Sequence, residues 1–290
     1  MTISESQLET WSHLGGIDAA QNTHTAIRYA LKQHSWGSGV SYDDYLQGSY
    51  RNSTNIYGNS DVDLVVELTS TFYHNEMTET QKSALGFSPA SYSLSNFRED
   101  VISALRNHFG STYVDTAGSK SIKVLPNNGR LKGDVVVAAT YRYYEDTRLI
   151  AEGITFWNTK TREQITNYPK LHYENGVTKH SNTSQWYKPT VRIFKNARAN
   201  IYKNNSLLAG KFPSYCVECL LYNVPNTKFG TSYRDTYCNI VNWLNSALDS
   251  NSENFKCQNG IIPLFGNDST QWNVADAKLL VSKLIGLWNS

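Results

Sequence analysis

The segment GSYRNSTNIYGNSDVDLVVEL, residues 48–68, decides the fold of this chain. Its second half, residues 61–68, has the alternation and β-branched content of a strand. Side chains alternate across a strand, so Asp61 and Asp63 share one face and the apolar residues between and after them enter a core. Two adjacent carboxylates repel each other unless a cation lies between them. Their oxygens suit Mg²⁺ or Mn²⁺, so the pair is predicted to hold such an ion.

A third carboxylate stands in a second predicted strand. Asp134 opens the apolar run of residues 133–140. If this strand pairs with residues 61–68, the three carboxylates converge and can hold two metal ions, which activate a hydroxyl and steady a triphosphate. Alone, the D-x-D pattern is common and is better explained by a strand that ends in solvent. An EF-hand calcium loop is not favoured, because the glycine and distal glutamate of that motif are missing.

The first half of the segment changes this balance. Residues 48–59 are rich in Gly, Ser and Asn and are predicted to form a loop or turn. A small residue such as Gly48 lets a backbone N–H approach a phosphate closely, and the Ser49 hydroxyl adds a donor. A Gly-Ser turn ahead of a D-x-D strand is therefore predicted to grip a triphosphate beside its metal ions.

The rest of the chain divides into a mixed first lobe and a mostly helical second lobe. Apolar periodicity predicts helices at 5–34, 95–109, 185–203, 214–223, 232–248 and 274–288. The first has a weak point at Gly15-Gly16 that allows two helices, and Ser95 is expected to cap the second. A further strand is predicted at 121–126. We therefore expect an α+β chain, with a core lobe at residues 1–160 and a helical lobe at residues 161–290 that pack closely.

Composition excludes several classes of protein. The 290 residues carry a formal net charge of +2, which is too weak to indicate a nucleic-acid binder. No basic and apolar leader and no run long enough to span a bilayer is visible, so a cytoplasmic protein without a membrane partner is expected. Cys216 and Cys219 form a C-x-x-C motif without a second pair, and core packing is the preferred interpretation.

The order of these motifs resembles that of the polymerase-β-like nucleotidyltransferases, and within them the bacterial cGAS/DncV-like nucleotidyltransferases, in the branch related to oligoadenylate synthases and CdnE-type enzymes. The segments that carry the resemblance are residues 48–68, LKGDVVVAA, NYPKLHYENGVTKH, YKPTVRIFKNAR and FPSYCVECLLYNVPN. It spans about residues 35–245. It implies a polymerase-β-like lobe of mixed sheet and helices, packed on a helical lobe that completes the nucleotide-binding cleft.

The resemblance also implies roles for single residues of the first lobe. Asp61, Asp63 and Asp134 match the catalytic triad that binds Mg²⁺ or Mn²⁺, and Gly48 and Ser49 match the phosphate-binding turn.

The resemblance implies further roles for residues of the second lobe. Lys195 matches a lysine that reaches the triphosphate from the central helix. Ser214 matches a phosphate contact, and Tyr215 an aromatic residue that stacks on a base. Asn167 lies near the position where a base is read, and its amide offers a donor and an acceptor that suit uracil.

Lys195 also forms a pattern with two other cations. Lys188, Arg192 and Lys195 recur at helical spacing and would form one basic stripe. Without the carboxylates, such a stripe is better interpreted as a solvated helix face.

The resemblance implies a synthase of cyclic dinucleotides or trinucleotides from ATP, UTP or GTP, with release of pyrophosphate, in antiphage (CBASS) signalling through a product-sensing effector protein. A nucleic-acid activator is not expected, because residues 135–187 lack the cysteines of the zinc loop in the animal enzyme. The alternatives are a linear-oligonucleotide or other nucleotidyltransferase of the same superfamily, and a non-catalytic nucleotide-binding protein. Three converging carboxylates argue against the last.

Overall fold

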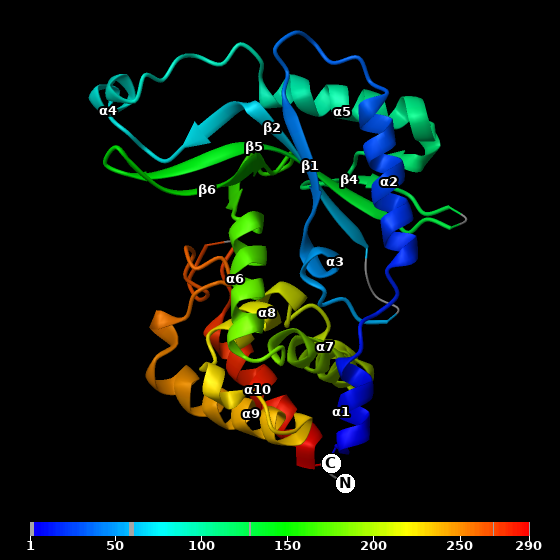
Figure 1. Ribbon diagram of the computed structural model, residues 1–290, viewed down its shortest axis with the longest axis vertical. Helices are drawn as coiled ribbons and strands as arrows, with labels where there is room; N and C mark the ends of the chain where they lie inside the picture. Colours follow the sequence, from blue (N-terminus) through cyan, green and yellow to red (C-terminus); the bar gives the residue numbers. More distant parts are fainter. Residues whose placement is uncertain (1–2, 58–60, 128, 269, 290) are drawn as a thin grey trace. The chain divides into compact units, whose positions relative to one another are not determined.

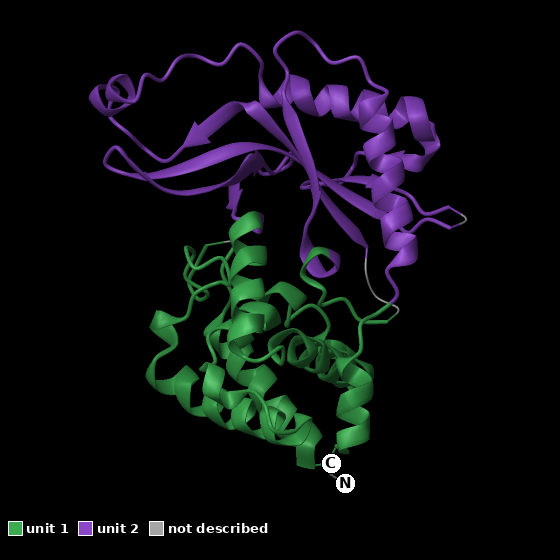
Figure 2. Cartoon of the chain, in the orientation of Figure 1, with its two compact units in different colours: residues 1–15, 51–60, 170–290 green, residues 16–50, 61–169 purple. Residues whose placement is uncertain are grey.

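The computed structural model describes residues 3–57, 61–127, 129–268 and 270–289. The chain divides into two compact units (Figure 2), here called the sheet unit, residues 16–50 and 61–169, and the helical unit, residues 1–15, 51–60 and 170–290.

One mixed sheet organises the sheet unit. Its strands are β1 (Tyr42–Leu46), β2 (Val62–His74), β3 (Val114–Asp115), β4 (Ile122–Val124), β5 (Gly133–Glu145), β6 (Arg148–Trp157) and β7 (Gln164–Asn167). They run in the order β1-β2-β5-β4-β3, while β6 pairs with the far half of β5 and β7 pairs with β6. The β2–β5 pair is parallel and the other pairs are antiparallel.

Helices cover one face of this sheet (Figure 1). The apolar side chains of β2 and β5 meet α2 (Asp18–Lys32) and α5 (Leu94–Phe109) in one buried cluster. Val62, Leu64 and Val66 are completely buried there, as their alternation predicts. A smaller cluster around Val65 and Phe156 lies on the opposite face. The sheet unit also contains α4 (Glu79–Ala84) and the 3₁₀ turn η1 (Ser111–Tyr113).

The helical unit has its own core. Its helices are α1 (Glu5–Ser12), α6 (Pro169–Asn182, apart from its first residue), α7 (Tyr187–Asn204), α8 (Ser214–Tyr222), α9 (Tyr233–Ser250) and α10 (Val274–Asn289), with 3₁₀ turns η2 (Ser206–Leu208), η3 (Asn226–Lys228) and η4 (Ser252–Asn254). Their apolar stripes form one cluster that includes Leu8 of α1, Phe194 of α7 and Leu284 of α10.

The N-terminal segment differs from its predicted place. The sequence suggested one lobe for residues 1–160, but residues 1–15 and 51–60 group with the C-terminal helices. The carboxylate of Glu5 accepts hydrogen bonds from the backbone N–H groups of Tyr233 and Arg234, at 2.8 Å each. The predicted break at Gly15-Gly16 is confirmed. The first helix ends at Ser12 and the next begins at Asp18, and between them a Cβ on Gly15 would lie 2.8 Å from the backbone of Ile56.

Other local predictions need correction. Residues 48–52 form a short helix, α3 (Gly48–Asn52), rather than loop, and residues 58–60 of the predicted turn lie outside the described residues. Ser93, not Ser95, caps α5, because its hydroxyl accepts from the Asn96 N–H. The β6–β7 region and α6 were not predicted.

Candidate active site

The ends of β2 and β5 bring the predicted acidic residues together. The two strands are parallel, and their register places Asp63 directly beside Asp134. Asp61 immediately precedes β2, two residues before Asp63, and so belongs to the same face of the strand. The strand pairing on which the prediction depended is therefore present in the sheet unit, although among the described residues no three Asp, Glu, His or Cys side chains are arranged so as to hold a metal ion.

A lysine that the sequence analysis did not single out lies among these carboxylates. The ammonium of Lys132 forms an ion pair with Asp61 and lies 3.8 Å from Oδ2 of Asp134. Lys132 stands two residues before Asp134, so strand alternation alone would have placed it on the acidic face. Its charge offsets part of the repulsion among the three carboxylates.

Asp134 has the properties of a cation ligand. Its Oδ1 atom is buried and has no hydrogen-bond partner in the described part of the chain. Burial raises the pKa of the Asp134 carboxyl, Lys132 lowers it, and the nearby charge of Asp61 raises it again. A buried carboxylate oxygen without a donor costs free energy unless a cation satisfies it. The donor set of Asp61, Asp63 and Asp134, all hard oxygens, fits Mg²⁺ or Mn²⁺.

The Gly-Ser turn packs directly against this acidic cluster. The backbone N–H of Gln47 donates to the Asp63 carbonyl oxygen at 2.9 Å. Gly48 has φ +66°, and a Cβ there would overlap Oδ2 of Asp63. Only glycine fits this position, for both conformation and space. Ser49 follows as the second residue of α3 and is partly buried. The predicted phosphate-binding turn and the predicted metal ligands are therefore neighbours within one unit.

We expect Gly48→Ala to lower kcat for nucleotidyl transfer by about 10²-fold, the typical effect of a misplacement of about 1 Å at a reacting group. The new methyl group must displace the Asp63 carboxylate. Steady-state kinetics measure the effect, with Gly39→Ala as the matched control. Gly39 also has a positive φ, +79°, but nothing lies within 4 Å of its Cβ position. Equal activities for the two variants would contradict the role of Gly48.

Lys195 lies in a buried polar network. Its side chain is buried in the helical unit, and its ammonium contacts the carboxylate of Glu218, the Thr54 hydroxyl at 3.1 Å and the Thr54 carbonyl at 3.2 Å. An ammonium has three N–H donors, and these three acceptors use all of them. Lys195 therefore belongs to a buried ion pair of the helical unit.

Glu218 is the centre of this network and was not predicted. It is fully buried and also accepts from the Thr54 hydroxyl at 2.7 Å and the Asn52 amide at 3.3 Å. The imidazole Nε2 of His172 lies 3.4 Å from Oε2 of Glu218, the oxygen that also accepts from Asn52. No local pattern distinguishes this glutamate in Cys216-Val217-Glu218-Cys219, because its partners come from distant segments.

The basic stripe is not a solvated face either. The Arg192 guanidinium donates to the backbone carbonyls of Ser12 and Ser53. The Lys188 ammonium lies 5.6 Å from the centre of the Tyr173 ring, and the Arg51 guanidinium lies 4.0 Å from the same centre. The three cations therefore have different roles within the helical unit.

The remaining predicted residues belong to different units: Ser214 and Tyr215 to the helical unit, and Asn167 to the sheet unit. Ser214 is the first residue of α8, and the Tyr215 ring stacks on His172, with centroids 5.2 Å apart at 24°. Asn167 ends β7 in the sheet unit and pairs in register with Ile154 of β6. Its side chain is partly buried, and its amide makes no hydrogen bond within the part of the chain that the structure covers.

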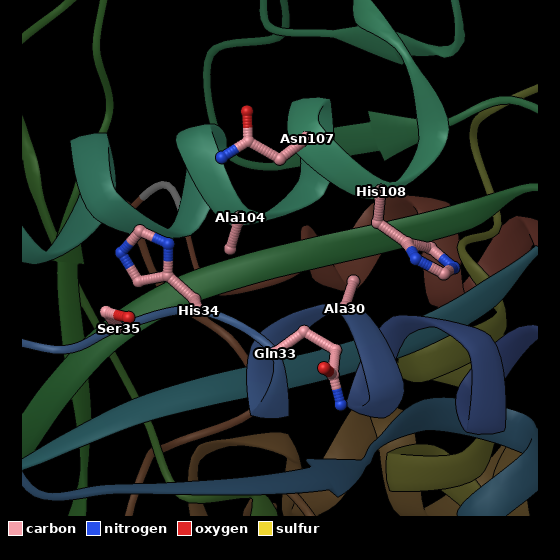
Figure 3. A pocket seen from close by; sticks show the side chains of 7 residues that line it. All are labelled: Ala30, Gln33, His34, Ser35, Ala104, Asn107 and His108. Carbon is pink, nitrogen blue, oxygen red and sulfur yellow. The ribbon is translucent and has the colours of Figure 1, made fainter.

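Two surface pockets of the sheet unit lie away from the acidic residues. One, of about 390 Å³, lies between α2 and α5, with His34 and His108 on either side (Figure 3). None of its seven lining residues carries a carboxylate. The other, of about 470 Å³, is lined in part by Val135 and Val137, which face away from Asp134 on β5. Neither pocket contains a predicted site residue.

The cysteines of the C-x-x-C motif lie inside the helical unit. Cys216 and Cys219 are buried free thiols in the helical core, in agreement with the packing interpretation. Within the described ranges, no helix combines the length and the apolar character that a membrane span requires.

The chain is similar to known nucleotide-cyclising enzymes. Residues 174–289 match the family described as the cGAS/DncV-like nucleotidyltransferase C-terminal helical domain. The sequence is 44% identical over 292 residues to the cyclic UMP-AMP synthase of Rhodothermus marinus, covering 99% of this chain and 98% of that protein.

Solved structures agree with this similarity. The structure of the Rhodothermus marinus CdnE c-UMP-AMP synthase with Apcpp and Upnpp matches 99% of this chain and 97% of its own, with a TM-score of 0.91 at 44% identity. The Elizabethkingia meningoseptica CdnE cyclic dinucleotide synthase with GTP and Apcpp has a TM-score of 0.81 at 31% identity and covers 98% of each chain. The predicted α+β fold is therefore confirmed.

Proposed function

The chain belongs to the cGAS/DncV-like nucleotidyltransferases, and from this premise we propose that it joins two nucleoside triphosphates into a cyclic dinucleotide at Asp61, Asp63 and Asp134. The observation that supports this most directly is local. The parallel register places Asp63 beside Asp134, and Gly48 packs against the Asp63 carboxylate. The proposed metal ligands and the proposed phosphate-binding turn are thus adjacent, as nucleotidyl transfer requires.

The chemistry consists of two similar transfers. A ribose hydroxyl attacks an α-phosphorus in line, the new O–P bond forms, the bond to pyrophosphate breaks and the hydroxyl proton is released. A second transfer on the linear intermediate closes the ring. When bound at the three aspartates, Mg²⁺ or Mn²⁺ would lower the pKa of the attacking hydroxyl and neutralise charge on the triphosphate. The Gly48 N–H and the Ser49 hydroxyl would hold a phosphate.

One substrate of the proposed reaction is UTP, and the other is ATP. The relative of 44% identity is a cyclic UMP-AMP synthase, and Asn167 supplies the amide that suits a uracil edge. Its Nδ2 can donate to a uracil carbonyl while its Oδ1 accepts from the ring N–H. By analogy with the family, the product acts in antiphage signalling through an effector protein that senses it.

The test is product analysis by mass spectrometry. The purified protein is incubated with all four NTPs and Mg²⁺ or Mn²⁺ and then treated with phosphatase. A phosphatase-resistant cyclic dinucleotide that contains UMP and AMP is expected. Linear, phosphatase-sensitive products would favour the oligonucleotide-forming alternative, and the absence of any nucleotidyl transfer would favour a binding protein.

Asn167→Leu should weaken the use of UTP relative to ATP. The substitution keeps the branched shape of the side chain but removes two hydrogen bonds, each worth about 0.5–1.5 kcal/mol, so incorporation of UMP should fall by roughly 5- to 150-fold. Competition between UTP and ATP in one reaction measures the ratio, and the rate with purine NTPs alone is the internal control. An unchanged ratio would remove Asn167 from base recognition.

A further inference from the structure

The Lys132 ammonium lies among the carboxylates of the proposed metal ligands. Its backbone carbonyl accepts from the Val62 N–H at 2.9 Å, which ties it into the β2–β5 ladder one residue before β5 begins. Because Lys132 and Asp134 are two residues apart, their side chains project from the same face. The ammonium therefore reaches Asp61 and Asp134 from a rigid base rather than from a mobile loop.

The contacts of Lys132 are those of a cation at a metal site. It pairs with Asp61 and lies 3.8 Å from Oδ2 of Asp134, two of the three proposed ligands. Its side chain is 29% exposed, so solvent does not fully screen these interactions. An ammonium and a divalent ion that use the same carboxylate oxygens exclude each other, because Mg²⁺ requires those oxygens in its coordination shell.

We propose that Lys132 is a resident cation of the acidic cluster. While no metal is bound, its ammonium neutralises the carboxylates of Asp61 and Asp134. When a metal ion enters, the ammonium leaves these carboxylate oxygens to the metal and then pairs with the triphosphate. The last step follows from charge. A displaced ammonium beside divalent ions is repelled unless an anion is present, and the triphosphate is the anion that arrives with the metal. This role rests on the proposed function.

The chain offers a matched control for the charge alone. Lys123 stands opposite Asp134 in the β4–β5 register, and its charge lowers the pKa of Asp134. It has no ion pair with the three aspartates in the part of the chain that the structure describes. Lys123→Met therefore removes one positive charge near the site without removing a group that competes for the carboxylate oxygens.

The test measures Mn²⁺ binding without nucleotide, on the metal-free full chain at low salt, from the electron paramagnetic resonance signal of free Mn²⁺. Lys132→Met should bind Mn²⁺ about 3- to 10-fold more tightly than the wild-type chain, the range expected when a partly exposed competing ion pair is removed. Lys123→Met should change the affinity less. In turnover at saturating Mn²⁺, Lys132→Met should raise KM for ATP more than it lowers kcat, and Lys132→Arg should partly restore KM.

Other outcomes would overturn the proposal. They are unchanged or weaker Mn²⁺ binding by a folded Lys132→Met chain, an equal shift in Lys123→Met, or no Mn²⁺ binding by the wild-type chain. Thermal unfolding of each variant shows whether it is folded. These results are separate from the proposed function, because cyclic products from the wild-type enzyme establish that activity whatever Lys132 does.

Discussion

Asp63→Asn should lower kcat for cyclic dinucleotide synthesis by about 10³-fold or more, the scale on which preorganised electrostatic stabilisation of a transition state acts. The substitution keeps the shape of the side chain beside Gly48 and the backbone bond to Gln47, so the turn and the strand register should persist. It removes the negative charge that a metal ligand beside Asp134 must supply. Chromatography of the phosphatase-treated products measures the rate.

The matched control for Asp63→Asn is Glu145→Gln. Glu145 lies at the far end of β5 from Asp134 and pairs with exposed Arg148, so its carboxylate belongs to the same sheet but not to the acidic cluster. This control should synthesise product at the wild-type rate. Wild-type synthesis by Asp63→Asn, with its thermal unfolding unchanged, would show that Asp63 is not a metal ligand.

Glu218→Ala should destabilise the helical unit by about 3–5 kcal/mol, because it leaves the charge of Lys195 buried without its partner. Burial alone would raise the pKa of Glu218, but Lys195 and His172 outweigh it and hold that pKa far below its usual range. A carboxyl with a depressed folded-state pKa stabilises the fold above its unfolded pKa of about 4.3. This contribution is lost as pH falls from there through the folded-state pKa.

Urea unfolding at neutral and acidic pH measures the effect of Glu218→Ala. The double variant Lys195→Met/Glu218→Gln should recover part of the loss, because it leaves no buried charge unpaired and the glutamine oxygen can still accept from Thr54. Glu79→Gln is the control, since it breaks an exposed ion pair with Lys82 and should not change stability measurably. A loss in Glu218→Ala as small as in this control would contradict the network's role.

Local patterns were sufficient for the parts of the fold that repeat along the chain. The alternation in residues 61–68 predicted β2 and its buried face, and the helical periodicity of the second half predicted α7, α8, α9 and α10 to within a few residues. The acidic positions Asp61, Asp63 and Asp134 were recognisable because a charged group beside a buried strand requires a partner. The family and its fold followed from the order of these motifs and are confirmed by the similar proteins.

Some local signals were present but too weak to decide the structure. The short helix α3 lies in a segment rich in turn-forming residues, where composition favours loop. The β6 and β7 strands follow a run of tyrosines without clean alternation, and their pairing with β5 stabilises them. Lys132 shares the face of Asp134 by simple alternation, but only the structure shows that its ammonium reaches Asp61.

Tertiary structure alone decided which distant groups meet. The sequence determined that strands, helices and an acidic cluster must form, because periodicity and charge act over a few neighbouring residues. It did not determine that Lys195 pairs with Glu218 and donates to Thr54, or that residues 1–15 join the C-terminal helices. Such contacts join segments far apart in the chain, and their geometry depends on how whole elements pack, which no local pattern encodes.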